Sequence, residues 1–237
     1  MKGVILCFHP QARIVDLCHQ VGAYDVLGGA LALAASYRYF PPGTVHLAVV
    51  DPGVGSARRA LLAQAGEWLF LAPDNGLLEL VWRRHPHRVL ALRTEEFALQ
   101  PISNTFHARD VFAPAAGRLA SGARPEDLGS PITDYARLEI PPVRRPAPGR
   151  LEGAVLQVDR FGNLITNLEP AELPAAFLLR AGGALVTTLR SSYAAALPGE
   201  IFAIAGSSGY LEISMNQASA AETAGAAPGT IVEVLES

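Results

Sequence analysis

Apolar positions in the first 130 residues fall into short runs separated by Ala- and Leu-rich segments. Short apolar runs are typical of buried strands, whereas the longer segments are better suited to helices. Strands are predicted at 44–50, at 60–74 in two pieces around Ala65 and Gly66, and at 88–93. Helices are predicted at 24–38, 75–84 and 108–122. Pro114 limits the start of the last helix and Gly122 ends it. This alternation predicts an α/β fold with a mostly parallel central sheet.

The pattern changes near residue 129. Residues 129–150 are rich in Pro and Gly and lack helical periodicity, which is typical of a linker. Beyond them, hairpin-like strands are predicted at 153–168, 184–190, 200–216 and 230–235. We therefore predict an N-terminal α/β domain at 1–130, a linker at 131–150 and a smaller all-β domain at 151–237.

Composition narrows the class of protein. The chain has 237 residues, half of them hydrophobic, a net charge of -3 and no basic stripe, which argues against nucleic-acid binding. No apolar run approaches the roughly 18 residues that span a membrane, and the N-terminus is a poor signal peptide. Cys7 and Cys18 are the only cysteines, so a disulfide framework is not expected and a reducing cytoplasm is the expected compartment.

The stretch "VVDPGVGSARR" places Asp51 at the end of a predicted strand, before a Gly-rich turn that leads to Arg58. A strand followed by such a turn suggests an anion-binding loop, but the dinucleotide fingerprint is incomplete and the phosphate-binding GxxxxGK[ST] pattern is absent. A carboxylate at this place would also repel phosphate. On these residues alone, Asp51 as a turn residue and Arg58 as a surface charge remain good alternatives.

His107 follows Phe106 in "SNTFHARDVFAP", where a helix is expected to begin. A helix N-terminus disfavours the imidazolium, so this histidine could stay neutral and accept a proton. The alternative is a histidine that bonds to the backbone at a helix start. The six histidines form no HxxxH or Cys/His cluster, so no metal site is expected.

Two motifs in the β-rich half could bind a small molecule. "QVDRFGNLITN" carries Asp159, Phe161 and Asn163, and "AGSSGYLEISMN" carries Ser207, Ser208, Glu212 and Asn216. Both also suit ordinary hairpin turns. A third polar group, Asp74 to Gly76, is best interpreted as a helix N-cap.

Seven segments, in order, resemble the S-adenosyl-L-methionine (SAM) hydrolases, also called SAM hydroxide adenosyltransferases, which are relatives of the fluorinase and chlorinase. They are "MKGVIL", "ARIVDLCHQV", "FPPGTVHLAVVDPGVGSARR", "LAPDNGLL", "SNTFHARDVFAP", "VDRFGNLITNL" and "GSSGYLEISMNQASAAE". No single segment is decisive, but the ordered set spans almost the whole chain. The resemblance places "GVILC" in a helix, although these residues alone favour a strand.

The resemblance implies a barrel-like C-terminal domain and a homotrimer with active sites between one subunit's N-terminal domain and a neighbour's C-terminal domain. The catalytic triad falls on Asp51, Arg58 and His107. The family's substrate-binding positions correspond to Asp159, Phe161, Asn163, Ser207, Ser208, Glu212 and Asn216. No cofactor is implied: SAM is the substrate, and adenosine could co-purify as product.

Two departures from the family pattern stand out. Ala108 replaces the usual glycine after the triad histidine. Relatives also carry a "TDFG" strand and another Asp, expected to hold the ribose hydroxyls, ahead of the residues that match "MKG". Either the start codon is misassigned or ribose is bound differently.

The implied reaction is attack of water or hydroxide on C5′ of SAM, which yields adenosine and L-methionine. A SAM-dependent halogenase is an alternative, disfavoured because Asp51 would repel a halide that must shed its water. A non-catalytic adenosine or SAM sensor is a second alternative.

Overall fold

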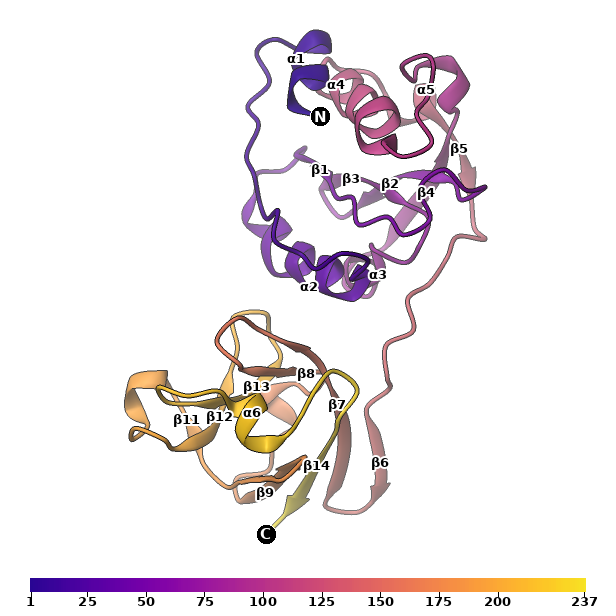
Figure 1. The fold of residues 1–237 in the computed structure, drawn as a ribbon. Helices are drawn as coiled ribbons and strands as arrows, with labels where there is room; N and C mark the ends of the chain where they lie inside the picture. Colours follow the sequence, from indigo (N-terminus) through magenta and orange to yellow (C-terminus); the bar gives the residue numbers. More distant parts are fainter. The chain divides into compact units, whose positions relative to one another are not determined.

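The computed structural model describes all residues, Met1–Ser237. The chain divides into two compact units, Met1–Leu138 and Glu139–Ser237, which are described separately (Figure 1). No helix is both long and apolar enough to cross a membrane.

The first unit is built on a five-stranded sheet with the order β1-β3-β2-β4-β5. Its strands are β1 (Val45–Leu47), β2 (Ala60–Ala65), β3 (Trp68–Pro73), β4 (His87–Leu92) and β5 (Gly129–Ile132). Only β1 and β3 run parallel, and the other neighbours are antiparallel. The predicted mostly parallel sheet is therefore wrong: the sheet is mixed, because β2 and β3 are joined by a tight turn at Gly66, and such a hairpin makes its strands antiparallel.

Helices cover both faces of this sheet, as Figure 1 shows. On one side lie α1 (Lys2–Phe8), α4 (Ala113–Ala120) and α5 (Pro125–Leu128), and on the other lie α2 (Val26–Ser36), its 3-10 extension η1 (Tyr37–Tyr39) and α3 (Glu79–Trp82). Residues 2–8 thus form a helix, as the family resemblance implied. The strand β2 is apolar along almost its whole length because both of its faces are covered.

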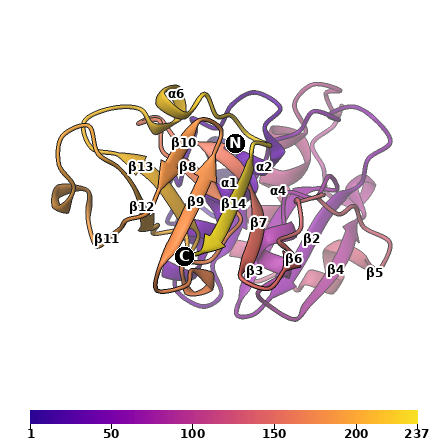
Figure 2. The same ribbon diagram turned by 90° about the horizontal axis from the view of Figure 1, so that it is seen from below.

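The second unit is a nine-stranded curled sheet (Figure 2). Its strands are β6 (Arg144–Ala147), β7 (Arg150–Val158), β8 (Leu164–Thr166), β9 (Phe177–Ala181), β10 (Ala184–Val186), β11 (Leu189–Arg190), β12 (Ile201–Ala205), β13 (Leu211–Met215) and β14 (Ile231–Glu236). The first half of β7 pairs with β14 and its second half pairs with β8, with a register shift after Val155. This irregularity lets one strand serve both parts of the curled sheet, which encloses the main apolar core of the unit.

Short helical segments complete the two units. They are η2 (Thr94–Glu96) and the π-helical turn η3 (Ala108–Phe112) in the first unit, and η4 (Pro170–Glu172), η5 (Tyr193–Ala195) and α6 (Ala220–Ala224) in the second. Both ends of the expected 131–150 linker are in strands, because β5 begins before it and β6 pairs with β7 within it.

Candidate active site

Asp51 and Arg58 lie at the two ends of one loop, which connects the region after β1 to the start of β2. Bonds within the loop fold it into consecutive turns, with Ser56 donating from Oγ to the carbonyl of Gly53 at 2.7 Å. Gly55 has φ of +79°, and a Cβ there would lie 2.3 Å from the carbonyl oxygen of Asn104. A residue without a side chain is therefore required where this loop passes the segment that leads to His107.

Arg58 bonds to Asp51 with two of its nitrogens. Its Nε donates to Oδ1 at 2.9 Å, and its Nη2 makes a short contact with Oδ2. The two side chains are only 10% and 6% exposed. The guanidinium also lies over the ring of Phe112, 5.6 Å from the ring centre. A bidentate pair in such a sheltered place has a fixed geometry, which a surface ion pair lacks.

His107 completes this cluster from a different loop. Nη2 of Arg58 lies 2.8 Å from Nδ1 of the imidazole. The pKa of His107 is lowered, first by burial and then by the positive charge of Arg58. The ring makes no helix-cap bond, so the alternative of a backbone-bonded histidine at a helix start does not describe it.

A buried carboxylate holds the segment that carries His107. Asp110 is 2% exposed and accepts two bonds from Arg109, at 2.6 and 2.9 Å. It also accepts from the backbone N–H of Ser103 at 2.8 Å. Asp110 was missed by the sequence analysis; its position within "HARD", one turn after the histidine, is the only signal that could have indicated it.

In the second unit, Asp159 organises the turn between β7 and β8. Its Oδ1 accepts from the N–H groups of Phe161 and Asn163, and its Oδ2 accepts from the side-chain amide of Asn163 at 2.9 Å. Asn163 is buried, whereas the ring of Phe161 is exposed and carries the guanidinium of Arg160 at 4.7 Å. The turn chemistry expected for this motif is present, and it leaves an aromatic face open.

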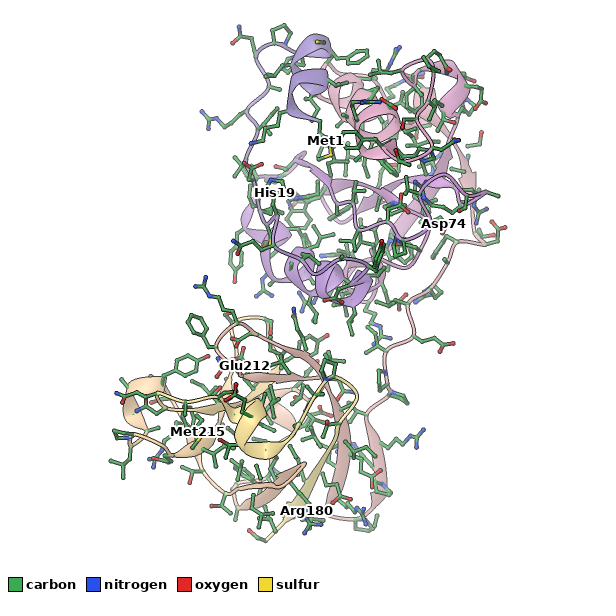
Figure 3. All side chains as sticks on the ribbon, viewed as in Figure 1. Met1, His19, Asp74, Arg180, Glu212 and Met215 are labelled. Atoms are coloured by element: carbon green, nitrogen blue, oxygen red, sulfur yellow. The ribbon has the colours of Figure 1, made fainter.

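Glu212 lies on β13, in the unit where Figure 3 labels it together with Met215. It is buried and accepts a bond from the hydroxyl of Tyr193 at 3.0 Å. Burial, and then the nearby charge of Asp159, raises the pKa of Glu212, while the hydroxyl of Tyr193 opposes the rise. Burial and Glu212 together raise the pKa of Tyr193 to about 12. Tyr193 was not singled out from the sequence, which contains no local signal for it.

The remaining predicted residues lie near this carboxylate in sequence. Ser207 and Ser208 occupy the turn between β12 and β13. Asn216 lies beyond the end of β13 and donates to the carbonyl of Ala196 at 2.7 Å. Period-two spacing would place Asn216 on the same strand face as Glu212 and Ser214, but β13 ends one residue before it.

The prediction that Asp74 to Gly76 form a helix N-cap is wrong. The helix α3 begins at Glu79, and its N-cap residue, Leu78, makes no side-chain cap bond. Asp74 and Asn75 instead contact the chain on both sides of the Asp51–Arg58 loop. The apolar segment after Gly76 is long enough to suggest a helix start, but its first residues form turns.

The structure thus brings Asp51, Arg58 and His107 together in the first unit, and Asp159, Asn163 and Glu212 into one polar region of the second. Groups of three or more His, Cys, Asp or Glu side chains that could hold a metal ion are absent. Chemically, the first cluster offers an anion, a cation and a neutral imidazole within hydrogen-bond reach of one another. This combination suits orientation and deprotonation of a small nucleophile.

Comparisons with known proteins identify the family of this chain. The profile of the SAM hydroxide adenosyltransferase N-terminal domain matches residues 1–129, and that of the C-terminal domain matches residues 153–233. The chain belongs to the SAM hydroxide adenosyltransferase family.

Several named relatives share most of their length with this chain. It is 41% identical to an (R)-S-adenosyl-L-methionine hydrolase from Thermus thermophilus, over 99% of this chain and 92% of the relative. It is 37% identical to a protein of the same name from Salinispora tropica, over 98% of this chain and 90% of the relative. A fluorinase from Nocardia brasiliensis is 29% identical over 98% of this chain and 90% of its own.

Solved structures show the same fold. The crystal structure of an uncharacterized conserved protein from Thermotoga maritima matches with a TM-score of 0.90 and 29% identity, over 99% of this chain and 93% of the other. The crystal structure of a conserved hypothetical protein from Thermus thermophilus matches with a TM-score of 0.80 and 38% identity, over 98% of this chain and 92% of the other.

Proposed function

We propose that this protein hydrolyses SAM to adenosine and L-methionine. The observation that carries the proposal is the contact of one guanidinium, that of Arg58, with both Asp51 and His107, in a chain of this family. Hydrolase relatives at 41% and 37% identity over nearly the full chain support the same reaction.

In the proposed reaction, the oxygen of water forms a bond to C5′ of SAM while the bond between C5′ and sulfur breaks. The electron pair of the breaking bond goes to sulfur, which leaves as the neutral thioether of methionine. The attacking water loses one proton. Because the sulfonium is already an activated leaving group, the enzyme need not protonate it, and one well-placed water is the principal requirement.

The contacts suggest how the three side chains divide this task. Nδ1 of His107 faces a guanidinium, which only donates, so the ring proton is on Nε2. His107 therefore orients the attacking water by donating a hydrogen bond from Nε2. The carboxylate of Asp51 is then the group that accepts the proton of this water. Arg58 stabilises the developing hydroxide.

Positioning supplies most of the proposed rate enhancement. Near-attack alignment is worth about 7–11 kcal/mol in favourable cases. A positioned base contributes roughly 10²–10⁴-fold, which corresponds to fewer kcal/mol. The sheltered, bidentate pair of Arg58 and Asp51 supports a mechanism of this kind, because it fixes the donors and acceptors before substrate arrives.

We assign substrate recognition to the second unit. The negative charges of Asp159 and Glu212 suit the ammonium and sulfonium groups of SAM, and the exposed ring of Phe161 suits stacking. Asn163 and Asn216, with Ser207 and Ser208, suit the polar edges of methionine or adenine. Since the triad and these residues lie in different units, we propose that the protein acts as a homotrimer in which different subunits complete each site.

Product analysis tests the function. Chelator-treated protein is incubated with SAM in buffer without halide, and again with chloride or fluoride. A hydrolase forms adenosine and methionine at the same rate in all three, well above the spontaneous rate. A 5′-halogenated product would identify a halogenase, and bound but unchanged SAM would identify a sensor.

A further inference from the structure

Two consecutive residues, Asp74 and Asn75, hold both ends of the loop that carries Asp51 and Arg58. One end of this loop is Val50, the residue before Asp51, and the other end is Arg59, the residue after Arg58. We call the contacts of Asp74 and Asn75 with these two residues the loop clamp. Figure 3 labels Asp74 in the first unit.

At the first end, the amide of Asn75 donates from Nδ2 to the carbonyl oxygen of Val50 at 2.8 Å. Its Oδ1 accepts from the N–H of Leu77 at 3.2 Å, which fixes the orientation of the amide. The carbonyl of Val50 belongs to the peptide plane that precedes Asp51. The bond therefore sets the direction from which the carboxylate of Asp51 leaves the backbone.

At the other end, Asp74 bonds to Arg59 through both its side chain and its backbone. Its Oδ2 accepts from Nε of Arg59 at 2.8 Å, and its N–H donates to the carbonyl of Arg59 at 3.0 Å. Its Oδ1 accepts from the N–H of Ala136 at 2.7 Å, so both oxygens are engaged. The side chain of Asp74 is only 6% exposed, which shelters these bonds from water.

The loop between these ends needs external support. Hydrogen bonds within the loop form its turns, but two of its residues are glycines, one of them with a positive φ, and glycine restricts the backbone less than any other residue. Yet Arg58 must meet Asp51 on its own loop and His107 on another loop at the same time. The clamp supplies that restraint, because fixed ends leave the loop few ways to displace the guanidinium.

We infer that Asp74 and Asn75 are positioning residues for the triad, acting through the backbone of Val50 and Arg59; as a statement about catalysis, this rests on the proposed hydrolysis. A purely structural ion pair would affect the stability of the unit alone. A clamp would affect the chemical step and the environment of His107 as well.

The test compares Asn75→Ala and Asp74→Asn with a matched control, Asp127→Asn. Asp127 also accepts from an arginine, Arg124, and from a backbone N–H in the same unit. Each variant is measured for thermal stability, SAM dissociation constant, single-turnover rate across pH, and the ¹⁵N NMR signals of the His107 ring without substrate.

Both clamp variants are expected to lower the single-turnover rate by about 10- to 100-fold with SAM affinity retained, since small misplacements near a reacting centre have effects of this size. The midpoint of the acid limb of the pH profile and the pKa of His107 both rise toward 6.5, the ordinary value for histidine, because Arg58 no longer stays in contact with Nδ1. Asp127→Asn changes none of these.

Unchanged rates and unchanged His107 signals in both variants would overturn the inference, as would equal effects of Asp127→Asn. If Asp74→Asn does not fold, Asn75→Ala, which removes no charge, decides alone. If the unaltered protein does not hydrolyse SAM, the proposed function fails, and the His107 signals still decide whether the clamp positions the triad.

Discussion

Arg58 places Nη2 at 2.8 Å from Nδ1 of His107. A guanidinium carries only donors, so Nδ1 must offer its lone pair and the neutral ring must carry its proton on Nε2. Protonation of Nδ1 would direct two N–H groups at each other and would break this contact. The tautomer of His107 is therefore set by Arg58, and the site depends on an imidazole that stays neutral.

The rate of hydrolysis is expected to be lost at acid pH with a midpoint below 6.5, the ordinary value for histidine. The pKa of His107 is lowered by burial and by Arg58, so the neutral ring persists as pH falls through 6.5 and is lost only at lower pH. Single-turnover rates from pH 8 to pH 5 measure this limb. A midpoint above 6.5 would contradict a lowered pKa of His107.

Asp51→Asn is expected to lower the single-turnover rate by roughly 10²–10⁴-fold, the range for loss of a positioned base, with little change in SAM affinity. The amide keeps the shape but removes the charge that pairs with Arg58 and accepts the proton. His107→Ala should act similarly, and the double variant should lose less than the two effects multiplied, because the residues act as one unit. Weakened SAM binding with an intact single-turnover rate would make Asp51 a binding or turn residue.

Asp159→Ala is expected to raise the Michaelis constant much more than it lowers the maximal rate. Asp159 lies in the second unit, and its carboxylate holds Asn163 in place by accepting a hydrogen bond from the side-chain amide of Asn163. Initial-rate measurements over a range of SAM concentrations separate the two parameters. Glu96→Ala, which removes an exposed carboxylate that pairs with Arg93 in the first unit, is the control; a loss confined to the maximal rate would contradict the assignment of Asp159 to substrate recognition.

Buried His46 is expected to make the protein less stable at acid pH. Burial lowers its pKa from 6.5 to about 4, and its Nε2 has no hydrogen-bond partner. The unfolded state therefore binds the proton first, and stability falls as pH decreases from 6.5 to 4, by about 3 kcal/mol at 1.36 kcal/mol for each pKa unit.

Urea unfolding of the protein and of His46→Leu at several pH values measures this contribution. The variant should show a shallower loss of unfolding free energy between pH 6.5 and pH 4. Equal slopes for the two proteins would show that His46 does not resist protonation in the folded state.

Much of the fold follows from local sequence patterns, but the direction of the strands does not. Apolar runs located β2, β3 and β4 because each is buried by neighbours. An apolar strand covered on both faces has the same composition in parallel and antiparallel sheets. The short turn at Gly66, with φ of +56°, was the informative feature, since only antiparallel neighbours can be joined so closely.

The candidate site was predictable only where its residues lie close in sequence or match a family motif. Asp51 and Arg58 share a loop, and His107 follows a recognisable segment. The contacts of Asn75 with Val50 and of Tyr193 with Glu212 join residues that are distant in sequence. Nothing local distinguishes such partners: an Asn before Gly is typical of ordinary turns, and Tyr193 belongs to no recognisable motif.

Arg58 and Arg59 are neighbours in the chain, yet they pair with different carboxylates: Arg58 with Asp51, and Arg59 with Asp74 and Asp134. Their side chains are chemically identical, so the position of Arg58, seven residues after Asp51, is what pairs its guanidinium with that carboxylate. A deletion within the loop would change this spacing even though both arginines remained. The length of the loop is thus itself part of the site. A homologue that has both arginines but a different spacing from the aspartate is not expected to share the same pairing.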